Sequence, residues 1–469
     1  MANFGAALPN TITVQLQVYY TSFLGYPALA SGAVRGITLM LDALLDPLMG
    51  YISDRTRSRF GRRMPYIATG ALVMAAGLLG MWTVPRGLSE FQFYAYLFAM
   101  QIIFTVGTTM TGIPFSALIP ELAKDYSAKT VLVAWMQSGT YVGTVFGGSV
   151  RAYVEWRGTA ANGFQEFAIY CALGMVACYW FFIFLVKEPP PPADRAAAFE
   201  ARRRELRAYL RRQLRDIGRT LSFAAADRHF LILFCSVFIY QAGVLAGIWL
   251  YTFLLQDWFG TTWNTPFAQQ YVPRVFRDAF FLFIFFAIGC GIFFLPFWNW
   301  LGKRCEKRTC LMIGIIGVAI SYGSSYYLFA PRSYPLLIAY CIVTAFFYCS
   351  ANIFPQSMLA DIATHSEYVR GEANEGMYYG AYSFLTKLYN AASLVWTGFA
   401  VDHLLHYQRG ESVERVVQTA ETMWRMRVLY AAPALVAAFF AIPVLLRYDL
   451  TRQRMAEVRA AIEKRTRGG

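Results

Sequence analysis

The chain of 469 residues has few charged side chains: Asp, Glu, Lys and Arg together make up 15% of it. Soluble globular domains carry about 25% charged residues. With 57% hydrophobic residues, the chain is too apolar for a soluble enzyme of this length, and its composition predicts an all-α polytopic membrane protein. The four histidines form no metal-ligand motif, and no nucleophile stands beside a base. We therefore expect no enzymatic activity.

Acidic side chains are scarcer than basic ones: 28 Asp and Glu stand against 42 Lys and Arg, a formal charge of +14. In a soluble protein this excess suggests a nucleic-acid partner. Here the basic residues cluster in short loops beside apolar segments, as the positive-inside rule describes. We therefore expect no nucleic-acid partner, but a multi-pass protein of a bacterial cytoplasmic membrane with both termini in the cytoplasm. The first eight residues carry no basic segment, so no cleaved signal peptide is expected.

About twelve windows have the roughly 20 apolar residues that cross a bilayer. Their approximate cores are residues 11–30, 34–53, 66–84, 92–118, 131–153, 166–186, 230–255, 279–301, 310–330, 335–356, 377–400 and 426–446. The first window is the most polar, which suits a helix that faces a cavity. In the fifth, Gly139, Gly143 and Gly147 recur at every fourth position and predict close helix packing. The eight cysteines are interpreted as packing residues.

A charged segment at 188–228 divides the chain near its midpoint. It opens with four prolines at 189–192, which cannot continue a helix, and then becomes rich in Ala and Arg. An amphipathic helix on the inner membrane surface and a solvated linker both fit this composition. We therefore predict a six-helix half over 1–187, a cytoplasmic linker over 188–228, a second six-helix half over 229–447 and a cytoplasmic tail over 448–469. Two such halves are typical of a transporter with its solute site between them.

Two carboxylates interrupt the second apolar window. Asp42 and Asp46 lie between Arg35 and Pro47, and their spacing places them on one helix face with Cβ atoms about 5–6 Å apart. An ionised side chain at the bilayer centre costs roughly 2.5–3.5 kcal/mol on insertion scales and marks a functional site. Two like charges this close stay ionised together only with a cation between them. The pair predicts a site for Na⁺ or H⁺, whereas a structural ion pair with another helix would need only one acid.

A basic loop follows the same window. Asp54 and Arg55 stand at its start, and Arg62 and Arg63 stand near its end. An acid within a basic cluster can form ion pairs that close the cytoplasmic side of a transporter and break when the halves move. We therefore interpret these four residues as a cytoplasmic gate. The alternative is plain control of topology by positive charge.

Three stretches of sequence carry a family resemblance. They run from Asp46 to Tyr66, from Ile113 to Leu122, and from Asp361 through Glu367 to Met377. With them the chain resembles the glycoside-pentoside-hexuronide:cation symporter family, typified by the melibiose carrier, over nearly its whole length. The resemblance implies a twelve-helix major facilitator fold and cation-coupled uptake of a solute by alternating access. It implies no organic cofactor and no metal beyond a coupling Na⁺ at the acid pair.

The resemblance also implies site residues. In that family two acids of helix 2 and a threonine of helix 4 form the cation site, which here implies Asp42, Asp46 and Thr109. A lysine of helix 11, twelve residues after the loop glutamate, belongs to the same network. Counted from Glu375 this is Lys387, a lone cation in an apolar window that needs a partner. Two carboxylates and one ammonium leave a net charge of −1, so a bound Na⁺ or H⁺ makes the site neutral and easier to occlude.

Four positions depart from the family pattern. An oxygen-bearing asparagine before the second acid is replaced by Leu45, which favours H⁺ without excluding Na⁺. The charged sugar ligands of helices 1, 4 and 5 align with Ala6, Gly112 and Gln137, so specificity for galactosides does not carry over. Side chains that could line a solute site, and that also suit ordinary packing, are Tyr19, Tyr20, Gln137, Tyr141, Trp249, Asn352 and Trp396.

These patterns predict a secondary active symporter for a glycoside, pentoside or sugar acid, coupled to Na⁺ or H⁺. Its substrate and coupling residues are predicted to be Lys387, Gln137, Tyr141 and Trp396. A cation-coupled carrier of a lysolipid or another amphiphile on the same fold is the alternative. A transport-inactive sensor is less favoured because the tail after residue 447 is short for a signalling domain. We expect a monomer that contacts membrane lipid and a small-molecule substrate.

Overall fold

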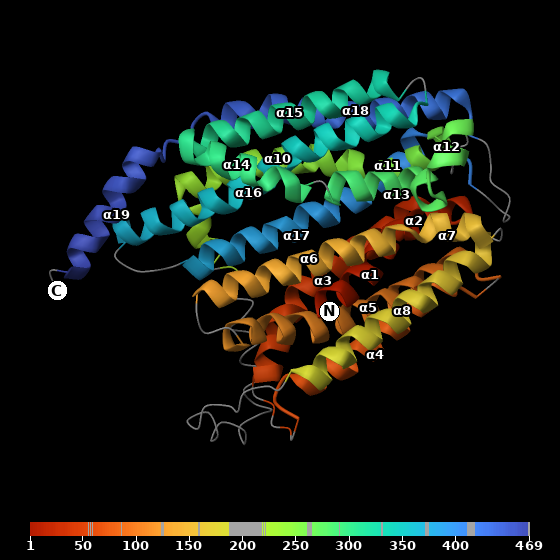
Figure 1. The fold of residues 1–469 in the computed structure, drawn as a ribbon, viewed down its shortest axis with the longest axis horizontal. Helices are drawn as coiled ribbons and strands as arrows, with labels where there is room; N and C mark the ends of the chain where they lie inside the picture. The colour runs from red at the N-terminus through yellow and green to blue at the C-terminus, as the bar shows by residue number, and fades with distance from the viewer. Residues whose placement is uncertain are drawn as a thin grey trace. The chain divides into compact units, whose positions relative to one another are not determined.

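In the computed structural model, every regular element in the described part of the chain is a helix, and turns and loops connect these helices (Figure 1). Outside the described part lie residues 55, 57, 59, 86, 123–125, 158–159, 187–217, 219, 221, 260–264, 290, 330–331, 371–374, 410–417 and 468–469. The predicted linker at 188–228 falls largely among them. The predicted division into halves at 1–187 and 229–447, with a tail from 448, therefore stays a prediction.

The described residues form two compact units, which we call the first unit and the second unit. The first unit comprises residues 1–211, 255–284 and 394–422. Its helices are α1 (Ala2–Ile12), α2 (Leu16–Ser22), α3 (Ala28–Asp54), α4 (Met64–Trp82), α5 (Glu90–Leu122), α6 (Tyr126–Gly148), α7 (Val150–Arg157), α8 (Ala160–Leu185), α12 (Pro266–Tyr271) and α13 (Ala279–Ile284). Short 3₁₀ and π segments are η1 (Thr13–Gln15), η3 (Leu255–Phe259), η4 (Arg274–Arg277) and η6 (Ala400–Leu404).

Glycines let the helices of the first unit approach backbone to backbone. A Cβ atom placed on Gly107 of α5 would lie 2.3 Å from the Met74 nitrogen of α4. On α6, a Cβ atom at Gly143 would lie 2.5 Å from the Phe4 carbonyl oxygen, and one at Gly147 would lie 2.8 Å from that of Leu8. Only a residue without a side chain fits such distances. The predicted close packing of the glycine repeat is therefore confirmed at two of its three positions.

The second unit comprises residues 212–254, 285–393 and 423–469. Its elements are α10 (Arg228–Ile248), α11 (Leu250–Leu254), η5 (Phe285–Gly289), α14 (Gly291–Arg304), α15 (Lys307–Leu328), α16 (Tyr334–Arg370), α17 (Glu375–Phe399), α18 (Ala420–Leu445) and α19 (Arg452–Arg467). Helix α17 passes into the first unit at Leu394, and α18 enters the second at Met423. The core is rich in tyrosine: the hydroxyls of Tyr340 and Tyr430 lie 2.6 Å apart, and Tyr430 stacks on Tyr322.

Within the described part, eight helices are long and apolar enough to cross a membrane, namely α3, α4, α5, α8, α10 with its continuation to Phe259, α15, α16 and α18. Each lies on one of the predicted windows. The remaining windows fall on helices that are interrupted or more polar: α1 to α2, α6 to α7, α13 to α14, and α17. Discontinuous helices are common where a transporter lines its pathway. The predicted all-α architecture is therefore confirmed.

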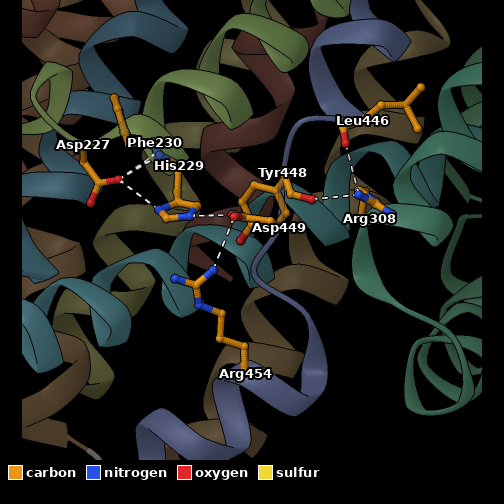
Figure 2. Close-up of polar contacts among 8 residues, drawn as sticks. All are labelled: Asp227, His229, Phe230, Arg308, Leu446, Tyr448, Asp449 and Arg454. Atoms are coloured by element: carbon orange, nitrogen blue, oxygen red, sulfur yellow. Dashed lines mark hydrogen bonds and ion pairs between the residues drawn. The ribbon is translucent and has the colours of Figure 1, made fainter.

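A polar network holds the end of the second unit from which α19 leaves (Figure 2). The Asp227 carboxylate caps α10 by accepting from the backbone nitrogens of His229 at 2.8 Å and Phe230 at 3.3 Å. Burial opposes its ionisation, but hydrogen bonds from His229, Tyr378 and the backbone lower the pKa of Asp227 to about 2. The His229 Nε2 atom lies 2.6 Å from Asp449, the residue that leads into α19.

The same network continues into α19. The Arg454 Nη1 atom lies 3.3 Å from the Asp449 carboxylate. Arg308 of α15 donates to the carbonyls of Leu446 at 3.1 Å and Tyr448 at 2.9 Å. Side chains of Met455 and Val458 are buried at the inner face of α19, which packs on α16. The tail helix is therefore held both by apolar contacts and by ion pairs.

We predict that Asp449→Ala loosens α19. The Asp449 side chain is about half exposed, at 51%. We therefore expect its loss to lower the free energy that holds α19 against the second unit by about 1 kcal/mol. This raises the fraction of molecules with α19 detached roughly fivefold. Trypsin should then cut after Arg452 and Arg454 about fivefold faster. The exposed Glu457→Ala on the same helix is the matched control. Equal cleavage rates in the two variants would contradict the proposed role of Asp449.

Candidate functional site

The acid pair lies within one uninterrupted helix. Helix α3 runs from Ala28 to Asp54 without a break, because its central residues are mostly Leu, Met and Ala, which favour helix. Both Asp42 and Asp46 are half-buried. Their spacing of four residues puts the two carboxylates on the same face. The structure therefore keeps the two charges adjacent and partly removed from solvent.

A threonine of a second helix bonds to the first of these acids. Thr109 of α5 is 4% exposed, and its hydroxyl donates to the Asp42 Oδ1 atom at 2.9 Å. The Thr105 carbonyl, at 3.1 Å, is a second acceptor for the same hydroxyl. If the proton turns to Thr105, the hydroxyl lone pairs face the carboxylate side, where a cation would take oxygen ligands. Two of the three predicted cation-site residues are thus in direct contact.

A basic residue shares this helix face. Arg35 precedes Asp42 by seven residues, or two helical turns, so both lie on one side of α3. The Arg35 Nη1 atom is enclosed by protein. The face of α3 therefore carries two carboxylates and one guanidinium. Arg35 was not among the predicted site residues, although its seven-residue spacing from Asp42 is visible in the sequence.

Open space lies one turn beyond the threonine on α5. A Cβ atom built on Gly112 would meet no described atom within 4 Å. Gly112 follows Thr109 by three residues and so lies on a neighbouring part of the same helix face. This is one of the positions where the resembling family has a charged sugar ligand. Among the described residues, no side chain therefore comes within 4 Å of that position beside Thr109.

The predicted substrate residues lie in different parts of the chain. Tyr141 of α6 and Trp396 of α17 are half-buried in the first unit, and the Trp396 Nε1 donor is enclosed, with no acceptor among the described residues. The Gln137 side chain lies outside the described residues. Lys387 of α17 is half-buried in the second unit, and its place in the coupling network stays a prediction.

Other aromatic and amide candidates have contacts within the protein. Tyr19 and Tyr20 are 2% and 0% exposed in the core of the first unit, where the Tyr20 hydroxyl donates to the Met81 carbonyl at 2.7 Å. In the second unit, Trp249 donates to the Ser393 hydroxyl at 3.1 Å. The exposed Asn352 donates to the Tyr348 carbonyl one turn back on its own helix.

The predicted gate is described only in part. Arg62 and Arg63 are 7% and 5% exposed, although they follow a polar loop. The Arg63 Nη1 atom donates to the Ala117 carbonyl at 2.7 Å, which ties the loop to the last turns of α5, where cations suit the helix dipole. The Asp54 side chain and Arg55 lie outside the described residues. The gating role of these four residues therefore stays a prediction.

One buried polar pair escaped the sequence analysis. Arg151, 6% exposed at the start of α7, donates through Nε and Nη2 to the Gln15 Oε1 atom at 3.1 and 2.8 Å. Its guanidinium also lies 5.4 Å from the centre of the Phe280 ring. Gln15 is 1% exposed in the 3₁₀ segment between α1 and α2. The available signal was that each residue is polar within a predicted membrane window.

Comparisons with known proteins identify the family of the chain. A family model described as "MFS/sugar transport protein" matches residues 4–452. The uncharacterized symporter sll1374 of Synechocystis sp. is 24% identical, with 99% of this chain and 95% of the relative covered. Sodium-dependent lysophosphatidylcholine symporter 1 of Mus musculus is 20% identical, with 96% of this chain and 84% of the relative covered.

A solved structure shows the same fold. The inward open conformation of the xylose transporter XylE from E. coli superposes with a TM-score of 0.58 at 14% identity, covering 98% of both chains. This confirms the major facilitator fold predicted from the sequence, and the family match confirms the predicted family and the absence of an enzymatic class. The chain is thus an integral multi-pass membrane protein that belongs to the MFS/sugar transport protein family.

Proposed function

We propose that this protein is a secondary active transporter that couples the movement of a small solute to Na⁺ or H⁺. The observation that carries the proposal is the hydrogen bond between Thr109 and Asp42, one turn from Asp46, in the middle of a helix long enough to span the membrane. Carboxylates at this depth are retained for function. Two full-length relatives are named symporters, and one of them is sodium-dependent.

Charge balance explains how the ion would act. On the face of α3, two carboxylates and the Arg35 guanidinium sum to −1, and one bound Na⁺ or H⁺ brings the sum to zero. A neutral site costs less to enclose in a low-dielectric interior than a charged one. The loaded site is therefore easier to occlude than the empty one, which is what coupling by alternating access requires. In this scheme Arg35 supplies a counter-charge on α3, and we assign Lys387 to solute binding.

A sugar or sugar acid is the favoured solute. The family description names sugar transport, and the open space at Gly112 beside Thr109 gives room for a solute next to the ion. A cationic Lys387 suits the carboxylate of a sugar acid. A lysolipid is the second candidate, favoured by the relative from Mus musculus and by Ala6 and Gly112 at positions where the family has charged sugar ligands. The basic loops support cytoplasmic termini.

The acid pair should be essential for accumulation. We predict that Asp42→Asn and Asp46→Asn each reduce concentrative uptake at least tenfold, because a neutral amide lacks the negative charge that balances a bound cation and does not take up a proton near neutral pH. Thr109→Val should weaken cation affinity by roughly 5-fold, about the net worth of one hydrogen bond. The matched control is Thr108→Val on the same helix, whose hydroxyl bonds to the Phe104 carbonyl. Wild-type accumulation in both Asn variants, at equal membrane amounts, would refute the cation site.

Lys387 should respond differently to two substitutions. We predict that Lys387→Ala loses transport, while Lys387→Arg restores part of it if the residue serves only as a charge. The restored fraction should be small if the ammonium binds one carboxylate in a fixed geometry. The measurement is uptake of a uronate and of its neutral sugar in the same vesicles. An alanine variant that transports both normally would make Lys387 a residue whose stem packs in the bilayer.

Solute binding and ion binding should be linked. Reciprocal coupling predicts that Na⁺ raises solute affinity by roughly 5–150-fold, or that affinity falls as pH rises if the ion is H⁺. Binding to purified protein should be titrated across Na⁺ and pH series with sugars, uronates and lysolipids as separate ligands. Leu45→Asn adds an oxygen beside Asp46 and should shift the preference toward Na⁺. Affinity that ignores both ions would show a uniporter and refute symport.

A further inference from the structure

The first turn of α3 has no capping side chain of its own. The residue before Ala28 is proline, which offers no side-chain acceptor for the free backbone N–H groups at a helix start. The acceptor for two of those N–H groups comes from a part of the first unit that is distant in the sequence. The Asp402 carboxylate in η6 accepts from the Ala28 nitrogen at 3.2 Å and from the Leu29 nitrogen at 2.7 Å. Its side chain is 5% exposed and also lies 3.3 Å from the Arg409 Nη2 atom.

Backbone contact accompanies this cap. A Cβ atom on Gly32 of α3 would lie 2.4 Å from the Leu394 carbonyl oxygen, and one on Gly398 would lie 2.5 Å from the Leu29 Cα atom. Both distances exclude any side chain at the two glycines without movement of the backbone. The start of α3 and the end of α17 therefore lie directly against each other at this end of the first unit.

A tyrosine links further segments at the same end. Tyr407 is 7% exposed and lies just beyond η6. Its hydroxyl is 2.8 Å from the Ser22 hydroxyl at the end of α2 and donates to the Asp257 carboxylate of η3 at 2.8 Å. The segment after α17 thus reaches the ends of α2, α3 and η3 through buried polar contacts. We call Asp402, Tyr407 and Arg409 together the outer latch.

We propose that the outer latch closes the transport pathway on the face of the membrane opposite to the basic loops, and that Asp402 must leave the start of α3 each time that face opens. The inference rests on the proposed transport function, because only alternating access requires these helix ends to separate. Ala28 begins the helix whose far end leads into the basic loop after Asp54, so the latch lies at the extracellular end if that loop is cytoplasmic.

The latch is mechanically connected to the ion site. Asp42 lies 14 residues after Ala28 on the same unbroken helix, or about 21 Å along its axis at 1.5 Å per residue. The part of α3 from Ala28 to Asp46 is continuous helix and contains no proline, so a displacement of its first turn is transmitted along the helix to the acid pair. An ion that fits the acid pair better in one of the two positions of α3 then shifts the latch equilibrium. Asp402 is accordingly a positioning residue for transport and not an ion ligand.

Cysteine labelling tests the latch without any solute. Leu39→Cys places a thiol on α3 between the latch and Asp42, and its labelling by a membrane-impermeant maleimide is measured from the extracellular side. We expect Asp402→Ala to raise the labelling rate at least fivefold and Asp402→Asn, which keeps one acceptor oxygen, to raise it less. Glu90→Ala, an exposed acid in the first turn of α5, is the matched control and should leave the rate unchanged. The same chains without Leu39→Cys report labelling of native cysteines.

The outcomes separate the latch from the transport proposal. Equal labelling in the Asp402→Ala, Asp402→Asn and Glu90→Ala backgrounds overturns the latch, whatever the coupling ion proves to be. A graded rise from Asp to Asn to Ala supports it, even in a protein whose solute binding ignores Na⁺ and pH. If Asp402→Ala does not reach the membrane, the Asp402→Asn variant decides, because it is nearly isosteric. An unchanged labelling rate in that variant, alongside normal membrane amounts, also counts against the latch.

Discussion

Two carboxylates on one apolar helix are the constraint on which the structure of the first unit depends. Removing an ionised group from water is unfavourable unless hydrogen bonds or opposite charges compensate for it. Around Asp42 the compensation comes from the Thr109 hydroxyl of a neighbouring helix, while Arg35 lies two turns away on the same face of α3. The tight approach of α4 to α5 at Gly107 fixes the helix that carries the threonine. The position of the Thr109 hydroxyl in the polar site thus depends on the apolar packing of α5 against α4.

The interrupted helices leave backbone N–H and C=O groups without the partners that a regular helix provides. These groups need hydrogen bonds from elsewhere in the protein. In a bilayer no water replaces a missing partner, so irregular backbone must bond within the protein. Asp278, 1% exposed, accepts from the Phe281 nitrogen at 2.6 Å at the start of α13. Asp402 does the same for α3 from 374 residues away. Buried acids therefore serve this chain in two ways, as helix caps and as the proposed ion ligands.

Polar side chains within the apolar windows are paired across long sequence separations. Arg151 and Gln15 are 136 residues apart, and Tyr407 and Ser22 are 385 residues apart. Hydrogen bonds between helices specify which faces meet, since dispersion contacts between apolar faces discriminate weakly. In the second unit the network of Asp227, His229 and Asp449 has the same effect at the start of the tail helix (Figure 2). These pairs position the helices on which the proposed mechanism relies.

The sequence by itself determined the membrane class, most long helices, the glycine repeat of α6 and the acid pair, because composition and spacing along one helix are local properties. The resemblance to a family added Thr109, which then proved to bond to Asp42. Only the tertiary structure decided that Arg151 pairs with Gln15, that Tyr19 and Tyr20 belong to the core, and that Asp402 caps α3. Each of these depends on which helix faces meet, and the energy of a contact between distant residues arises only after the helices have packed.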